Sequence, residues 1–151
     1  MTSDHAAFIQ QLLNTPGWLQ FIGDRNVRSE AEAYAYINKI NENPTVTYWT
    51  VSLPDETPSI GVISLIQRDY LEYPDIGFAF LPEFSGRGYA FEAASAVLDH
   101  LRTESNYPQL YAATLPDNTA SIKLLIKLGF HFERSENFEH QEKLLYSIHI
   151  A

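Results

Sequence analysis

The spacing of hydrophobic and polar positions predicts two amphipathic helices in about the first forty residues. Ser3 or Asp4 can cap the first helix, which ends at the turn-forming residues 14–17. The apolar residues that follow are expected to pack before the next turn. A capping box at residues 29–32, Ser-Glu-Ala-Glu, begins a second helix that extends to about Asn41.

The middle of the chain changes from a helical to a strand pattern. Thr45–Leu53 and Ile60–Gln67 are rich in β-forming residues, and the Pro54–Pro58 connection predicts a hairpin between them. A charged loop at 68–73 leads into Ile76–Leu81, a nearly continuous apolar run that is typical of a strand buried on both faces. Three consecutive strands are therefore expected here.

The second half of the chain returns to helical spacing, interrupted by one strand. A long amphipathic helix is predicted to begin at Tyr89, and Gln109–Thr114 is expected to form the next strand. Asp117 or Asn118 can cap a further helix, which Gly129 ends as a C-cap. The apolar stripe of the long helix consists of Tyr89, Ala90, Ala93, Ala94, Val97, Leu98 and Leu101.

Two final strands complete the predicted fold. Phe130–Arg134 and Lys143–Ile150 have the strand pattern, and the polar segment Ser135–Gln141 is expected to be a loop between them. The resulting order is α–α–β–β–β–α–β–α–β–β. It predicts a single domain over residues 1–151, of the α/β class, with a mixed, mostly antiparallel central sheet and helices on both faces.

Composition narrows the classes of partner. Of the 151 residues, 45% are hydrophobic and 19% are charged, which favours a folded domain. The formal net charge of −9 argues against nucleic acid or an anionic membrane and mildly favours a cationic amine, although acidity also serves solubility. No apolar run approaches the roughly 18 residues of a membrane span, and no signal-peptide pattern is present, so we expect a cytoplasmic location. The five histidines lack metal-ligand spacing, and the absence of cysteine excludes a cysteine acyl-enzyme.

Gly86 and Gly88 lie between the third strand and the long helix. Unpaired N–H groups at a helix N-terminus, next to glycines that permit close approach, favour phosphate binding. A P-loop is excluded because the Gly-Lys-Ser/Thr frame is missing. A dinucleotide fingerprint requires a small third residue, and Phe91 occupies that position. A Rossmann-type nucleotide-binding domain is therefore disfavoured.

Residues 82–94, PEFSGRGYAFEAA, resemble the pyrophosphate loop of the GCN5-related N-acetyltransferase (GNAT) family. A second match follows about thirty residues later: Asn118–Ile122, then Lys127–Phe130, which resembles the family's Asn-x-x-Ser helix ending in Leu-Gly-Phe. The resemblance covers about residues 4–134. It is strongest to the subgroup that contains the ribosomal-protein N-terminal acetyltransferases (RimJ/RimL type).

The resemblance also implies that an opening strand is missing. Family members usually begin with a strand before the first helix, whereas Met1 here lies almost directly on that helix. Thr45–Leu53 would then be a sheet edge, and exposed edges tend to be covered or paired. We therefore expect either self-association, as in a homodimer, or an upstream start that restores the strand.

The resemblance further implies acetyl-coenzyme A as co-substrate and no metal. Asn118 would hydrogen-bond the pantetheine arm, although it can also serve only as a helix cap. Ser121 matches a serine that hydrogen-bonds the departing thiolate, whereas many family members carry a tyrosine acid at the position of Leu125. Arg87 would pair with a phosphate or face solvent. The pyrophosphate would be held by backbone N–H groups of Phe84, Ser85, Gly86, Arg87, Gly88, Tyr89 and Ala90.

On the acceptor side, the resemblance makes Asp75 the candidate base, with a solvated strand-end aspartate as the alternative. The charged residues of the loops at 24–28 and 68–72 are candidate contacts for the acceptor. We expect direct attack of a neutral primary amine, such as a peptide N-terminus, on a thioester held between splayed strands Ile76–Leu81 and Gln109–Thr114. An acidic rim is expected to attract the amine. The alternative function is a non-catalytic module that binds coenzyme A or acyl-coenzyme A.

Overall fold

The computed structural model describes residues 1–55 and 58–151. Six strands form one sheet in the order β1-β2-β3-β4-β6-β5. The β3–β4 pair is parallel, and the other four pairs are antiparallel, which confirms a mixed, mostly antiparallel sheet. β1 lies at one edge, as the sequence predicted. The strands are β1 (Val46–Val51), β2 (Gly61–Ile66), β3 (Asp75–Phe80), β4 (Gln109–Thr114), β5 (His131–Phe138) and β6 (Gln141–His149).

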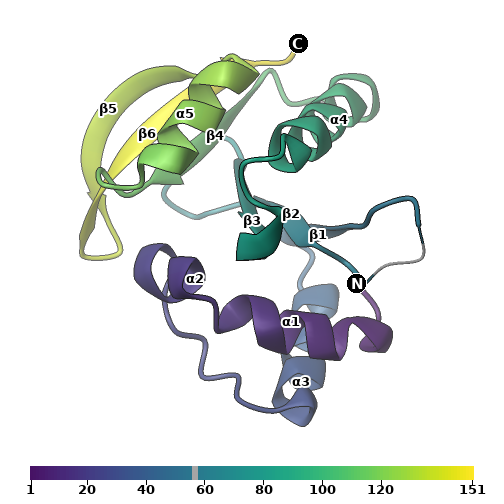
Figure 1. Cartoon of the computed structure of the whole chain (residues 1–151). Helices are drawn as coiled ribbons and strands as arrows, with labels where there is room; N and C mark the ends of the chain where they lie inside the picture. The colour runs from purple at the N-terminus through teal and green to yellow at the C-terminus, as the bar shows by residue number, and fades with distance from the viewer. Residues whose placement is uncertain (56–57) are drawn as a thin grey trace.

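Helices cover both faces of this sheet (Figure 1). Along β2, Val62 packs against the first three helices, whereas Ile63 and Leu65 pack against the last two, as the alternation of a strand requires. These two clusters of buried residues therefore lie on opposite faces of the sheet. The helices are α1 (Ala6–Leu13), α2 (Pro16–Phe21) and α3 (Glu30–Glu42) on one face, and α4 (Tyr89–Glu104) and α5 (Thr119–Leu128) on the other.

Several predicted helix ends are confirmed. The Ser29 hydroxyl accepts from the N–H of Glu32 at 3.1 Å and so caps α3. Asn118 caps α5 by accepting from the N–H of Ser121 at 3.3 Å, and Gly129 ends that helix with φ 101°. Within the residues described, no helix has both the length and the apolar character needed to cross a lipid bilayer.

The start of the chain differs from the prediction. Ser3 and Asp4 do not cap α1, because both lie in a 3₁₀ turn, η1 (Ser3–His5), that precedes it. The sequence also missed α2. Thr15 accepts from the N–H of Trp18 at 3.3 Å, and Pro16 occupies the first helical position. The Thr-Pro pair that ends one helix therefore begins the next, since proline suits a helix start as well as a stop.

The end of the chain also needs a correction. The segment Ser135–Gln141 is not a loop: β5 continues to Phe138, and β6 starts at Gln141. Only Glu139 and His140 form the turn, with φ 53° and 66°. Residues 131–137 are all exposed, so this edge strand has no hydrophobic alternation to reveal it. The predicted Pro54–Pro58 connection lies partly outside the described residues.

Candidate active site

A cavity of about 940 Å³ opens where β3 and β4 part. The β3–β4 ladder holds one residue pair, Asp75 with Tyr111, and the Tyr111 N–H donates to the Pro74 carbonyl at 2.9 Å. Beyond this point, the N–H of Leu81 donates toward β2, to Ile60 at 2.9 Å. Peptide groups alternate in direction along a strand, so those of even-numbered residues face β4. The cavity is therefore bordered by peptide groups of Ile76, Phe78 and Phe80.

The glycine loop, residues 84–90, lines one end of the cavity. Gly86 and Gly88 have φ 73° and 83°, a left-handed conformation that favours glycine, and Gly88 is the N-cap of α4. Apart from the adjoining backbone, no heavy atom of the described residues lies within 4 Å of the position that a Cβ would take at either glycine. The loop therefore leaves free space in front of a helix N-terminus, which fits a phosphate group. The lining residues of this loop are Phe84, Ser85, Gly86, Gly88, Tyr89 and Ala90.

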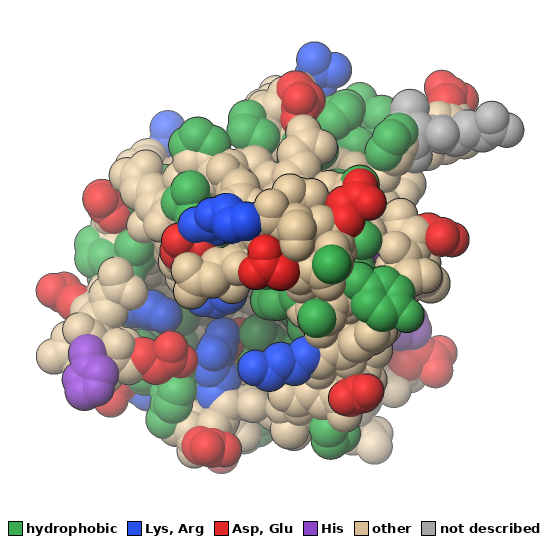
Figure 2. All heavy atoms as spheres, turned by 90° about the horizontal axis from the view of Figure 1, so that it is seen from below, with side chains coloured by type: hydrophobic (Ala, Val, Ile, Leu, Met, Phe, Trp, Pro, Cys, Tyr) green, Lys and Arg blue, Asp and Glu red, His purple; other side chains and the backbone are tan. Residues whose placement is uncertain are grey.

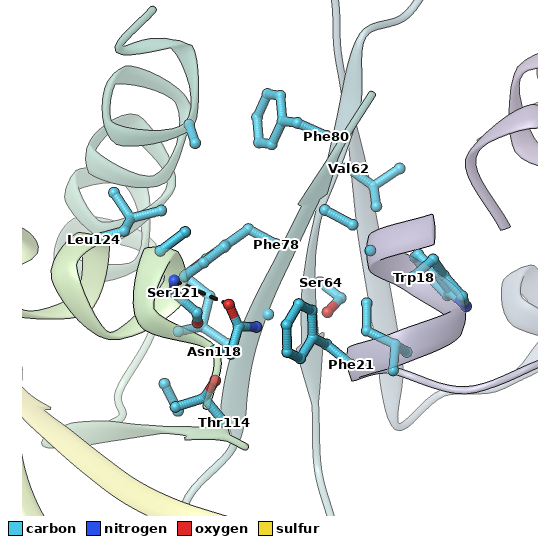
Figure 3. A pocket seen from close by; sticks show the side chains of 18 of the residues that line it. Trp18, Phe21, Val62, Ser64, Phe78, Phe80, Thr114, Asn118, Ser121 and Leu124 are labelled. Atoms are coloured by element: carbon cyan, nitrogen blue, oxygen red, sulfur yellow. Dashed lines mark hydrogen bonds between the residues drawn. The ribbon is translucent and has the colours of Figure 1, made fainter. Parts of the chain in front are cut away.

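Asn118 and Ser121 line the cavity from the start of α5 (Figure 3). Across from them lie Phe21 of α2 and Ser64 of β2, so the cavity is enclosed by elements from both halves of the chain. The Asn118 Oδ1 accepts the capping hydrogen bond, which leaves its side-chain NH₂ available to a ligand. Leu125, at the position of the family's usual tyrosine, is 1% exposed and packs in the core.

Asp75 lies at the end of β3 opposite the glycine loop, and the strand itself is about 16 Å long. It is 7% exposed, lines the cavity, and accepts from Arg68 Nε at 2.8 Å. Burial raises the pKa of the Asp75 carboxyl above its ordinary value, although the charge and hydrogen bond of Arg68 oppose the rise. The aspartate is therefore a stronger base than a solvated strand-end residue would be.

The β5–β6 turn supplies residues that the sequence did not indicate. Glu139 pairs with Arg68 Nη1 at 3.3 Å and accepts from the Tyr70 hydroxyl at 2.6 Å. That hydrogen bond, with the charge of Arg68, lowers the pKa of Glu139, whereas burial and then the same bond raise the pKa of Tyr70 to about 12. Gln141 and Lys143 of β6 also line the cavity. A loop was expected in this segment, so no signal directed attention to it.

Other predicted residues lie elsewhere. Arg87 is not among the described residues that line the cavity, and its guanidinium carbon lies 6.0 Å from the centre of the Phe84 ring. Asp24 and Arg28 form a salt bridge of 2.6 Å outside the cavity. The cavity lining among the described residues also lacks Asp69 and Glu72. Of the charged residues of these two loops, Arg25 and Arg68 are the ones that line this cavity within the described part of the chain.

The prediction of an acidic rim around the cavity is wrong. The charged residues that line the cavity comprise four basic and two acidic side chains: Arg25, Arg68, Lys127, Lys143, Asp75 and Glu139. On the face in Figure 2, Lys and Arg side chains likewise gather around a hollow. The net charge suggested the wrong sign for the cavity because it is a sum over the whole protein. Across the described residues, no group of three or more His, Cys, Asp or Glu is arranged to hold a metal ion.

Comparison with known proteins identifies the family. Residues 1–131 match the family model described as "Acetyltransferase (GNAT) domain". An uncharacterized N-acetyltransferase of Bacillus subtilis, YnaD, is 33% identical over 107 residues, which cover 71% of this chain and 62% of that protein. The [ribosomal protein uS5]-alanine N-acetyltransferase of Escherichia coli is 27% identical over 117 residues, 71% of this chain and 60% of that one. The chain thus spans less than two thirds of either relative.

A solved structure shows the same fold. Spermidine N-acetyltransferase from Vibrio cholerae, in complex with CoA and spermine, superposes with a TM-score of 0.82 and 20% sequence identity, over 99% of this chain and 92% of that one. The sheet, its splayed strands and the glycine loop define a domain of the acetyltransferase class. The chain belongs to the GNAT acetyltransferase family.

Proposed function

We propose that this chain transfers an acetyl group from acetyl-coenzyme A to a primary amine by direct attack in a ternary complex. One observation carries the proposal: a single cavity joins a glycine loop suited to phosphate with a buried carboxylate at the other end of β3. The structurally similar spermidine N-acetyltransferase from Vibrio cholerae forms a complex with CoA, which supports the choice of co-substrate.

The glycine loop would hold the pyrophosphate through backbone N–H groups, with the Asn118 NH₂ on the pantetheine arm. Phe78 and Phe80 direct peptide groups into the cavity, and such groups would hydrogen-bond the arm and polarise the thioester carbonyl. Lys127, whose Nζ lies 4.4 Å from the centre of the Phe91 ring, lines the cavity too and adds positive charge. Acetyl-coenzyme A supplies the acetyl group in activated form as a thioester.

Asp75 would take the proton from the amine, directly or through a water. Its raised pKa favours this role because a more basic carboxylate accepts a proton more readily. Ser121 would donate its hydroxyl hydrogen bond to the departing sulfur. With Leu125 in the core, this chain cannot use the family's tyrosine at that position.

The acceptor is an amine of low basicity, such as a peptide N-terminus. Forming the neutral amine at pH 7 costs about 4.6 kcal/mol for a lysine side chain but only about 1–1.4 kcal/mol for an α-amino group. A single carboxylate that is paired with Arg68 can deprotonate an α-amino group more easily than a lysine side chain, because the α-amino group requires less free energy. Lysine side chains should therefore be poor substrates.

A pH series on Asp75→Asn tests this mechanism. We expect the variant to lose about a hundredfold in kcat/KM at pH 6.5 with an N-terminal peptide. The deficit should shrink toward pH 9, where more of the amine is neutral without help. Asp69→Asn, a carboxylate of the neighbouring loop outside the cavity lining, is the matched control and should retain activity. Preference for N-blocked lysine peptides, or a deficit independent of pH, would contradict the proposal.

The alternative is a module that binds coenzyme A or acyl-coenzyme A without chemistry. Leu125 in place of the usual tyrosine is the observation that favours it. A turnover assay against a panel of amines separates the two functions, since a binding module would retain affinity for acetyl-coenzyme A and release no thiol.

A further inference from the structure

The end of the cavity that holds Asp75, here called the acceptor end, is lined by more positive than negative charges, whereas the protein as a whole is negatively charged. The chain carries a formal net charge of −9, yet the cavity lining holds four basic and only two acidic side chains. At the acceptor end these are Arg25, Arg68 and Lys143 against Asp75 and Glu139. A cavity that concentrates basic groups within an acidic protein favours ligands of negative charge.

Salt bridges within the cavity show which basic side chains make up the excess of positive charge. Arg68 contacts both carboxylates, Asp75 at 2.8 Å and Glu139 at 3.3 Å. Arg25 and Lys143, by contrast, form no salt bridge with any part of the chain that the structure describes. At the end of the cavity that holds Asp75, these two cations are therefore available to a ligand, whereas Lys127, which also lacks a salt bridge among the described residues, lies against the Phe91 ring.

The two available cations converge from distant parts of the sequence. Arg25 lies in the connection between α2 and α3, and Lys143 lies in β6, yet both line the cavity in which Glu139 lies. Hydrogen bonding from Tyr70 is the main cause of the lowered pKa of Glu139, and the charges of Arg68, Lys143 and Arg25 contribute to it. Both cations thus lie on the side of the cavity that holds Glu139, which Arg68 links to Asp75.

We infer that the amine acceptor carries an anionic group, which Arg25 and Lys143 bind while the amine faces Asp75. The inference rests on the proposed function and narrows its substrate class. A free or peptide-borne carboxylate close to the reacting amine, or a phosphate in that place, meets the requirement. An acceptor with a second cation, such as a polyamine, would meet like charge at this end of the cavity.

A panel of matched peptides tests the inference. The peptides differ only in the residue after the N-terminal alanine: glutamate, glutamine, lysine or phosphoserine. We expect the wild-type protein to show a kcat/KM at least tenfold higher for the glutamate than for the glutamine peptide, with the lysine peptide lowest. The phosphoserine peptide distinguishes a preference for phosphate from one for carboxylate, and either supports the inference. Equal values for glutamate and glutamine peptides, or preference for lysine, would overturn it.

Variants assign the preference to the two cations. Arg25→Gln and Lys143→Gln should each raise KM for the glutamate peptide about tenfold and leave KM for the glutamine peptide unchanged. Arg28→Gln, in the same connection, and Arg134→Gln, in β5, are the matched controls and should preserve the preference, because neither lines the cavity. Equal losses for both peptides would indicate a structural role and overturn the assignment.

Binding measurements separate this inference from the proposed function. By calorimetry, acetyl-coenzyme A should bind Arg25→Gln and Lys143→Gln as it binds the wild-type protein. A weaker affinity would assign these cations to the phosphates of the coenzyme and overturn the inference. If no peptide is acetylated, the proposed function fails, and direct titration of the glutamate and glutamine peptides still decides: tighter binding of the glutamate peptide that is lost in Arg25→Gln supports the anion site, and equal binding refutes it.

Discussion

Gly88 combines two requirements at one position. As the N-cap of α4 it has φ 83° and ψ 0°, and the space where a Cβ would lie is open. The backbone therefore demands a residue that tolerates the left-handed region, while the open space is where a phosphate would approach. A substitution can separate the two, because asparagine tolerates this conformation and a β-branched residue does not.

We expect Gly88→Asn to weaken acetyl-coenzyme A binding at least tenfold while the midpoint of thermal unfolding stays near that of the wild type. Gly88→Val should weaken binding and also lose about 1–2 kcal/mol of stability through backbone strain. Calorimetry and thermal unfolding measure the two effects. Gly129→Asn is the matched control, since Gly129 has φ 101° at the end of α5 but does not line the cavity. Unchanged affinity in folded Gly88→Asn would refute a phosphate site at this loop.

At the scale of secondary-structure elements, the β5–β6 hairpin contributes residues to the end of the cavity that holds Asp75. Its turn carries Glu139 to Arg68 and Tyr70, and the Tyr70 ring stacks on Phe138 with centroids 5.2 Å apart. Both turn residues have positive φ, the geometry of a two-residue hairpin turn that glycine and asparagine favour. This turn therefore holds a non-glycine residue, His140, at a strained position next to Glu139, which lines the cavity.

His140→Gly should stabilise the protein by about 0.5–1 kcal/mol, since relief of the left-handed strain exceeds the entropy cost of glycine. Denaturant unfolding measures the change. Glu139 keeps its contacts, so activity should not fall. His131→Gly, in the extended part of β5, is the control and should instead destabilise by a similar amount. Equal destabilisation by both variants would contradict the turn conformation.

At the scale of the whole molecule, the described part of the chain forms a sheet with two edge strands, β1 and β5, and the prediction made here concerns the β1 edge. β1 pairs only with β2 within the described part of the chain. The Thr45 and Val51 carbonyls accept hydrogen bonds from the N–H groups of Gln67 and Ile60. The peptide groups of odd-numbered residues in β1 therefore face β2, and those of even-numbered residues face outward from the sheet edge. An exposed row of peptide groups of this kind templates pairing with another strand.

We expect the protein to self-associate through this edge. Thr50→Pro removes an outward N–H without loss of a β2 hydrogen bond, so it should yield a folded monomer. Thr47→Pro, whose N–H faces β2, should unfold the edge and serves as the contrast. Light scattering with circular dichroism reports mass and fold together. A wild-type protein that remains monomeric at high concentration would sink this prediction.

Most of the fold could be predicted from local pattern. The β4 bounds, the Asn118 cap, the Gly129 C-cap and the glycine loop depend on contacts within a few residues, so sequence determines them directly. Prediction failed where a sequence motif is compatible with two structures, or where a segment lacks any pattern that indicates its structure. Thr15-Pro16 both stops α1 and starts α2, and the exposed edge strand β5 carries no hydrophobic alternation.

The sequence by itself determined the family and most of the sheet, and it located the glycine loop that we propose as the coenzyme end of the cavity, because these features follow from contiguous motifs and short-range geometry. Only the tertiary structure decided the acceptor end. Arg25, Arg68, Asp75, Glu139 and Lys143 come from separate segments, and their pairing depends on which side chains the folded chain brings together. Net charge is a sum over the surface, whereas recognition depends on the few charges that converge, and for this reason an acidic chain encloses a basic cavity.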